Sequence, residues 1–242
     1  MAESLSDKLK ALGVQVGARN LPPPRPRQRP PGIETIIPGT VVSTPFGETY
    51  VSENWYEQDY QHGQIRFRNS LSMHILSQWG RVPHLASAGF ERLLFLDTET
   101  TGLGGGTGTF AFLVGLGHLT QNGFHLIQLL MRAPEEEPAM LYLLNQYVSQ
   151  FDAVVTYNGK SFDIPLLNTR HVLNGFSTPF SQMSHVDLLP LARRLWRNRL
   201  PSRSLGNLEV ALVGVARTQE EVPGFLIPEI YFDYLRSGDA HP

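Results

Sequence analysis

The chain has 242 residues, 41% of them hydrophobic, and no cysteine. This is sufficient for one large domain, or for one domain with an appendage. Without cysteine there can be no disulfide, thiolate-bound zinc, iron–sulfur centre or cysteine nucleophile, so any metal must bind oxygen or imidazole. A formal net charge of −2 gives no overall attraction to a polyanion, which would need a local basic patch. We expect a cytoplasmic protein without a membrane partner, because no apolar run is long enough to span a bilayer and the amino terminus lacks a signal-peptide core.

Residues 1–32 are predicted to be a short helix followed by a linker. Ser4 or Ser6 is a plausible N-cap, and Gly13 a plausible helix end. In LPPPRPRQRPPG, residues 21–32, prolines remove backbone donors and favour an extended chain. The segment is either a semi-rigid spacer, or a basic arm that contacts phosphate or a docking site for a proline-binding partner.

Residues 33–90 are predicted to be an extension of the main domain. GTVVSTPFGETYVSEN indicates two short strands around a Pro-Phe-Gly turn, and residues 71–86 have a helical pattern. The chain therefore divides into 1–32, 33–90 and a main domain, 91–242.

The main domain begins with strands and continues with helices that alternate with strands. The segments RLLFLD, TFAFLVGLGHL and GFHLIQLLMR predict three neighbouring strands, the last two joined by a Gln-Asn-Gly turn. A helix in PEEEPAMLYLLNQYVSQF, a strand in AVVTYN and a helix in SFDIPLLNTRHVLNG that ends at Gly175 follow. The pattern predicts an α/β fold of the ribonuclease-H-like type, with a mixed five-stranded sheet and helices on both faces.

Two carboxylates end the first of these strands, in FLDTETTGL. Asp97 and Glu99 are two residues apart, so on a strand they point to one face and repel each other unless a proton or a cation lies between them. Asp163 in TYNGKSFDIPLL comes at a helix start, with Pro165 in the first turn. Oxygen-rich clusters of this kind suit Mg²⁺ or Mn²⁺. The alternatives are a polar loop with Asp97 as a cap and an ordinary N-cap at Asp163.

These two segments, in this order, resemble the first and second motifs of the DnaQ-like (DEDD) 3′-to-5′ exonuclease superfamily. With HVDLLPLARRLW, SLGNLE and VPGFLIPEIYFDYL, residues 33–240 are similar to its YprB-like bacterial branch. The resemblance implies a single-stranded DNA or RNA 3′ end as substrate and two Mg²⁺ or Mn²⁺ ions on three carboxylates. It also implies substrate contacts from the turn after the strand and from the second motif. The implied metal ligands are Asp97, Glu99 and Asp163, and the implied substrate-binding residues are Thr98, Thr100, Gly102, Leu103, Asn158 and Phe162.

The family also needs a fourth carboxylate in a third motif. We expect this motif beyond YLRSGD, so that the 91–242 domain would be incomplete at its carboxyl end and activity would be weak or absent. Asp187 in SHVDLLP is either a catalytic substitute or a strand-end residue beside the site, and Asp233 and Asp239 rank lower as solvated helix acids. His185 is expected to be a hydrogen-bonded structural histidine.

A basic segment bears on the substrate. LARRLWRNRLPSR, residues 191–203, contains five arginines and Trp196. It predicts either a track for single-stranded nucleic acid or a helix whose arginines are only solvated. Three functions stay open. They are an active metal-dependent 3′-to-5′ exonuclease, a catalytically inactive nucleic-acid-binding domain that works with a helicase or another partner, and another metal-dependent phosphoesterase.

Overall fold

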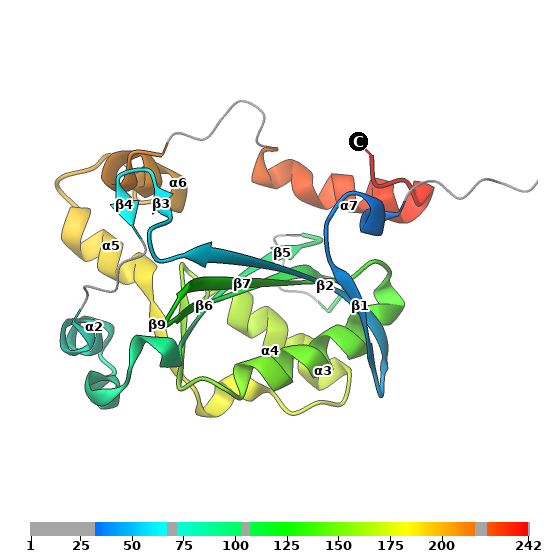
Figure 1. Ribbon diagram of the computed structural model, residues 1–242, viewed down its shortest axis with the longest axis horizontal. Coiled ribbons are helices and arrows are strands. Elements are labelled where there is room, and N and C mark those ends of the chain that lie inside the picture. Colours follow the sequence, from blue (N-terminus) through cyan, green and yellow to red (C-terminus); the bar gives the residue numbers. More distant parts are fainter. Residues whose placement is uncertain (1–31, 67–71, 103–106, 216–221, 242) are drawn as a thin grey trace, which may run out of the picture. The chain divides into compact units, whose positions relative to one another are not determined.

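The computed structural model describes residues 32–66, 72–102, 107–215 and 222–241, which belong to one compact unit of residues 31–242 (Figure 1). The predicted helix and linker of residues 1–32 lie, apart from Gly32, outside the described residues. In the described part of the chain, no helix is long and apolar enough to cross a membrane.

A seven-stranded mixed sheet forms the centre of this unit (Figure 1). The strand order is β1-β2-β7-β6-β5-β8-β9. Neighbours from β1 to β5 are antiparallel, whereas β5, β8 and β9 run parallel. The strands are β1 (Thr40–Thr44), β2 (Gly47–Glu57), β5 (Leu93–Thr100), β6 (Ala111–Thr120), β7 (Gly123–Leu130), β8 (Ala153–Thr156) and β9 (Ser184–Asp187). A separate two-stranded hairpin contains β3 (Gln61–His62) and β4 (Ile65–Arg66).

The predicted mixed sheet is confirmed, but the predicted number of five strands is wrong. The hairpin of β1 and β2 is part of the main sheet, because β2 pairs with β7 from Tyr50 to Glu57. Only the first half of β2 has buried apolar residues, Tyr50 and Val51, and its second half is largely polar. That polar half carries no hydrophobic periodicity, so the sequence did not indicate an eleven-residue strand.

Helices cover both faces of the sheet, as predicted. Figure 1 shows α3 (Glu137–Val148) and α4 (Asp163–Leu173) on one face. Even-numbered residues of β5, such as Leu94 and Leu96, pack against these helices, whereas Leu93 packs with α2 (Met73–Gly80) on the opposite face. The alternation follows from the two-residue repeat of a strand.

The remaining helical segments surround this core. They are α5 (Leu188–Trp196), α6 (Leu205–Leu208), α7 (Ile227–Ser237), the 3₁₀ turns Ile33–Thr35, Pro83–Ser87, Phe90–Arg92, Pro134–Glu136, Pro179–Gln182 and Gly224–Leu226, and a π-helical turn Glu209–Val213. The helix predicted over residues 71–86 is shorter than expected. It ends at Gly80 because Arg81 has a left-handed backbone and a 3₁₀ turn begins at Pro83, whose ring cannot continue an α-helix.

A buried ion pair positions α4. The guanidinium group of Arg170 donates two hydrogen bonds to the Glu137 carboxylate, Nε to Oε1 at 2.5 Å and Nη2 to Oε2 at 2.6 Å. A third bond runs from Arg170 Nη1 to the Thr107 carbonyl at 2.7 Å, and the guanidinium carbon lies 4.1 Å from the centre of the Phe110 ring. The network joins the last turn of α4 to α3 and to the segment that precedes β6.

Candidate active site

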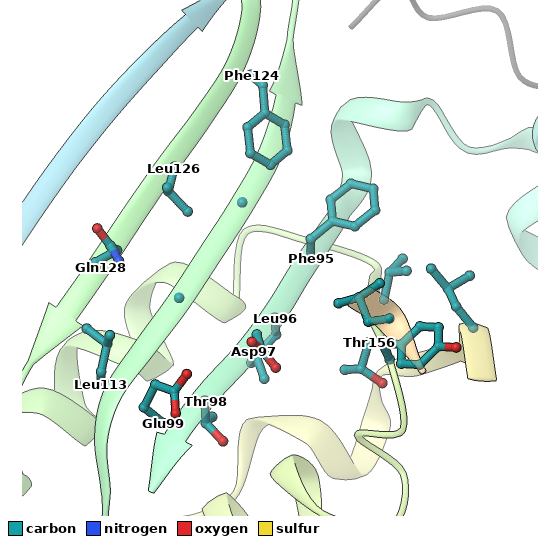
Figure 2. A pocket seen from close by; sticks show the side chains of 16 residues that line it. Phe95, Leu96, Asp97, Thr98, Glu99, Leu113, Phe124, Leu126, Gln128 and Thr156 are labelled. Carbon is teal, nitrogen blue, oxygen red and sulfur yellow. The ribbon is translucent and has the colours of Figure 1, made fainter. Parts of the chain in front are cut away.

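Asp97 and Glu99 lie near the carboxyl end of β5, on the face that α3 and α4 do not cover (Figure 2). Their partners on β6 are Gly115 and Leu113, respectively. The pairing register shifts between Glu99 and Thr100, and irregularities of this kind change the direction of side chains at a strand end. The predicted pair of carboxylates on one face is therefore present.

Both carboxylates have raised pKa values. Burial of the carboxyl group is the largest cause for Asp97, although part of this side chain is open to solvent, and the negative charge of Asp163 is the second. For Glu99, burial is again the largest cause, followed by the charges of Asp97 and Asp163. Each group is thus less stable in its ionised form than it would be in water, because other carboxylates are close and the surroundings are partly apolar.

Asp163 begins α4 and approaches β5 from the side of that helix. Its carboxylate is buried, and Oδ1 accepts a hydrogen bond of 2.5 Å from Thr98 Oγ1. Burial raises the pKa of Asp163, while the Thr98 hydroxyl and backbone hydrogen bonds oppose the rise. Because Thr98 stands between Asp97 and Glu99, one hydrogen bond connects the second motif directly to the first.

The three carboxylates interact through their charges but do not form a closed ligand set. In the described part of the chain, no ion pair connects any of them to a basic side chain, and none of their pKa shifts has a basic side chain as a cause. In the same part of the chain, no group of three or more His, Asp or Glu side chains is arranged to hold a metal ion. The site therefore has uncompensated negative charge distributed on two sides of the end of β5.

A pocket of about 540 Å³ lies beside Glu99 and Asp163. Its wall includes two exposed aromatic side chains, Phe162 at 53% and Phe225 at 78% exposure. Of the predicted substrate-binding residues, Thr98, Thr100, Gly102, Asn158 and Phe162 line this pocket, and Leu103 lies outside the described residues. Thr100 Oγ1 donates to the Gly102 carbonyl at 2.9 Å.

A second pocket, of about 420 Å³, opens beside Asp97 and Glu99 on the face of the sheet opposite α3 and α4. Figure 2 shows Phe95, Leu126 and Phe124 along its wall. A Cβ atom at Gly117 would lie 2.3 Å from the tip of the Phe124 ring, so a side chain at this position would displace the ring. The pocket is largely apolar and ends at the two carboxylates of β5.

Asp187, the proposed substitute for the fourth carboxylate, has its oxygens engaged by backbone donors. Oδ1 accepts from the N–H of Asn158 at 2.8 Å and of Leu189 at 3.0 Å, and Oδ2 accepts from the N–H of Lys160 at 3.1 Å. Asp187 thus caps α5 and holds the turn after β8, in which Asn158 has a positive φ of 71°. Asp187 is the last residue of β9, as its interpretation as a strand-end residue predicted.

The other acidic and basic residues that the sequence suggested lie elsewhere. Asp233 is exposed on α7 and pairs with Arg236, and Oδ1 of Asp239 accepts from the His241 N–H at 3.0 Å. A ring nitrogen of His185 is 2.8 Å from Thr156 Oγ1, so the prediction of a hydrogen-bonded histidine is confirmed. Burial and the nearby charge of Lys160 lower the pKa of His185 to about 4.

Sequence reasoning missed one contact and two residues of this region. The hydroxyl of Thr98, which was predicted only to contact substrate, donates a hydrogen bond to Asp163. Tyr157 lines both pockets, and Phe225, more than 120 residues from Glu99 in the sequence, lines the same pocket as Glu99. The signal that could have indicated Phe225 is an aromatic residue in VPGFLIP, a segment rich in proline and glycine.

The match to known families defines the class of protein. The model of the RNase_H superfamily matches residues 94–242, so the chain belongs to this superfamily. The chain is also 36% identical over 193 residues to the uncharacterized protein YprB of Bacillus subtilis (strain 168). That match covers 77% of this chain and 46% of YprB, so the chain spans about half the length of this relative. The resemblance to ribonuclease-H-like proteins and to their YprB-like branch is thereby confirmed.

Two solved structures are also similar. Exonuclease I of E. coli in complex with a dT13 oligonucleotide is 16% identical with a TM-score of 0.43, and the match covers 59% of this chain and 40% of that one. The family B DNA polymerase of Pyrobaculum calidifontis is 16% identical with a TM-score of 0.46, and the match covers 60% of this chain and 21% of that one.

Proposed function

We propose that the protein is a metal-dependent 3′-to-5′ exonuclease that hydrolyses phosphodiester bonds of single-stranded nucleic acid. The observation that carries this proposal is the set of Asp97, Glu99 and Asp163. The negative charge of Asp163 raises the pKa of Asp97 and of Glu99, and a hydrogen bond from Thr98 joins Asp163 to β5. The carboxylates lie beside a pocket with exposed aromatic side chains, and no basic side chain among the described residues forms an ion pair with them.

The donor chemistry fits divalent cations. Asp97, Glu99 and Asp163 supply oxygen ligands of the kind that Mg²⁺ and Mn²⁺ prefer, and a cation would remove the repulsion that raises their pKa values. Two such ions, when bound, would activate a water molecule and stabilise the leaving oxygen of a phosphodiester. The side chains would have to move toward each other on metal binding, because they form no ready ligand set in the described residues.

The other residues of the site would position these ligands and the terminal nucleotide. Thr98 holds the Asp163 carboxylate toward β5, and Asp187 holds the turn that contains Asn158. The exposed ring of Phe162 offers an apolar face for a base, and such stacking does not depend on the sequence. In this proposal, Asp187 is a positioning residue and not a metal ligand, because its oxygens already accept three backbone hydrogen bonds.

A polyanionic substrate is supported by a third pocket, of about 440 Å³, which adjoins the first two. Tyr157 and Asn158, which line the pocket beside Glu99, also line this one, and Arg193 and Arg203 contribute positive charge to it. Burial raises the pKa of Tyr157, and the positive charges of Arg193 and Arg203 oppose the rise. The phosphate backbone of a strand that extends from the carboxylates into this pocket would therefore contact Arg193 and Arg203.

A second candidate is a nucleic-acid-binding domain without catalysis, which would act with a helicase or another partner. It is favoured by the absence, among the described residues, of a group of three acids or histidines arranged for a metal.

One experiment separates the two functions. Purified protein is incubated with Mn²⁺ and with single strands labelled at the 3′ or the 5′ end. Release of nucleoside monophosphate from the 3′ end, abolished in Asp97→Ala, is the expected result. Retention of the labelled strand without cleavage would support the binding domain, and release that persists in Asp97→Ala would refute the assignment of the carboxylates.

A further inference from the structure

Two groups of arginines in the described part of the chain differ in their partners. Arg92, Arg132, Arg170 and Arg236 each form an ion pair with a carboxylate. No ion pair to a described residue involves the arginines of α5 and of the segment after it, which are Arg193, Arg194, Arg197, Arg199 and Arg203. In a chain with a net charge of −2, arginines without an ion pair to any described residue are thus concentrated in one short segment.

The geometry of α5 directs two of these arginines to different pockets. Leu189 and Arg193 are four residues apart, share one side of the helix, and line the pocket next to the candidate active site. Pro190 and Arg194 share the neighbouring side and line a different pocket, of about 350 Å³. This pocket, called the Arg194 pocket below, is also lined by Asp187. It has no residue in common with the two pockets that contain the carboxylates of β5.

Three cationic side chains from different elements line the Arg194 pocket. Arg81 follows α2, Lys160 lies in the turn after β8, and Arg194 is on α5. The single carboxylate of the pocket, Asp187, is buried and bound by three backbone N–H groups. Trp79, at 44% exposure, adds an aromatic face. Positive charge next to an exposed indole is the combination that binds a phosphate together with an adjacent base.

The backbone at Arg81 is unusual in a way that favours a functional role. Arg81 has φ 59° and ψ 40°, a left-handed conformation that is unfavourable for a residue with a Cβ atom. A glycine would adopt this conformation without strain, but the glycine of this segment, Gly80, lies one position earlier. A Cβ atom at Gly80 would lie 3.2 Å from a methyl group of Val186, so a side chain at this position would require a small shift of Val186. An arginine thus occupies a strained position beside the pocket, and strain of this kind occurs at binding sites.

We propose that the pocket formed by Trp79, Arg81, Lys160 and Arg194 binds a phosphate and a neighbouring base of single-stranded nucleic acid, upstream of the terminal nucleotide. This inference rests on the proposed function and adds to it a second contact point for the strand. Long strands would contact both the carboxylate pocket and this pocket, whereas a dinucleotide would reach only the first.

The test compares strands of two lengths and two variants. Arg81→Asn and Arg194→Gln each remove one charge, and asparagine tolerates the left-handed backbone. Arg66→Gln is the matched control, because it removes one exposed charge outside the described pockets. Binding of a fluorescent strand of about ten nucleotides is measured in EDTA over a range of salt concentrations, and release of monophosphate from a dinucleotide is measured with Mn²⁺.

Each pocket variant is expected to bind the long strand about fivefold to tenfold more weakly. The slope of log K against log salt should fall by about 0.7 for each lost phosphate contact. The control variant should bind the long strand as tightly as the unchanged protein does. Both pocket variants should cleave the dinucleotide at the rate of the unchanged protein. The inference is overturned if the pocket variants and the control bind the long strand equally, or if inorganic phosphate competes as well as the strand does. Absence of monophosphate release from the unchanged protein would instead refute the proposed function.

Discussion

Replacement of Thr98 by valine tests whether the two motifs act as one site. Thr98→Val keeps the shape of the side chain and deletes the 2.5 Å hydrogen bond to Asp163. A hydrogen bond to an ionised group contributes about 1.5–3 kcal/mol, and a domain of this size loses about 2–4 °C in Tm for each kcal/mol. We therefore expect a decrease in Tm of about 3–12 °C without metal. Because Asp163 would lose the group that orients it, the affinity for Mn²⁺ should fall about 10- to 100-fold.

Scanning calorimetry of the two proteins over a series of Mn²⁺ concentrations measures both effects. An ion that binds the folded state alone stabilises it by about 2.7 kcal/mol at a hundredfold excess over its Kd. Thr49→Val is the matched control, because it removes a buried strand hydroxyl that donates to the Leu130 carbonyl at 3.3 Å, a neutral acceptor. It should lower Tm without changing the response to Mn²⁺. An identical Mn²⁺ response in Thr98→Val and the unchanged protein would refute the role of Thr98.

Three further predictions concern charge. Asp97→Asn should raise Tm in metal-free solution at neutral pH, because the folded-state pKa of Asp97 is raised, so its contribution to stability is full at low pH and is lost as the pH rises through that pKa. Calorimetry that shows a lower Tm would contradict this. His185 has a pKa of about 4, below its usual 6.5, so its contribution of up to about 3 kcal/mol is present above pH 6.5 and lost as the pH falls toward 4. Urea unfolding of His185→Gln over this range should show a weaker pH dependence than the unchanged protein. Glu137→Ala should lower the free energy of unfolding by about 3–5 kcal/mol, because it leaves the guanidinium of Arg170 buried without its carboxylate. A loss below 1 kcal/mol in urea unfolding would contradict that expectation.

Hydrophobic periodicity was sufficient for the central part of the fold. β6, β7 and α4 occur where the apolar runs and Gly175 indicated them, because buried apolar residues recur along each of these segments at the spacing of a strand or a helix. The second half of β2 was missed because it is held by pairing with β7 and not by buried side chains of its own. The end of α2 was missed because the left-handed residue that ends this helix is Arg81 and not the glycine one position earlier.

The site could be predicted to the level of its carboxylates but not to that of its contacts. The two-residue spacing of Asp97 and Glu99 requires a common face on any strand. The bond from Thr98 to Asp163 joins residues 65 positions apart, and α4, which carries Asp163, is tied to α3 by the pair of Glu137 and Arg170. Such contacts between distant segments leave no periodic signal.

The central claim is that Asp97, Glu99 and Asp163 converge on divalent cations. A crystal structure of the protein grown with Mn²⁺, with anomalous diffraction measured at the manganese edge, tests it most directly. We expect anomalous peaks bound by the oxygens of all three carboxylates, with Asp97→Asn crystals lacking them. A map without peaks at this position, or with manganese bound away from Asp163, would contradict the claim.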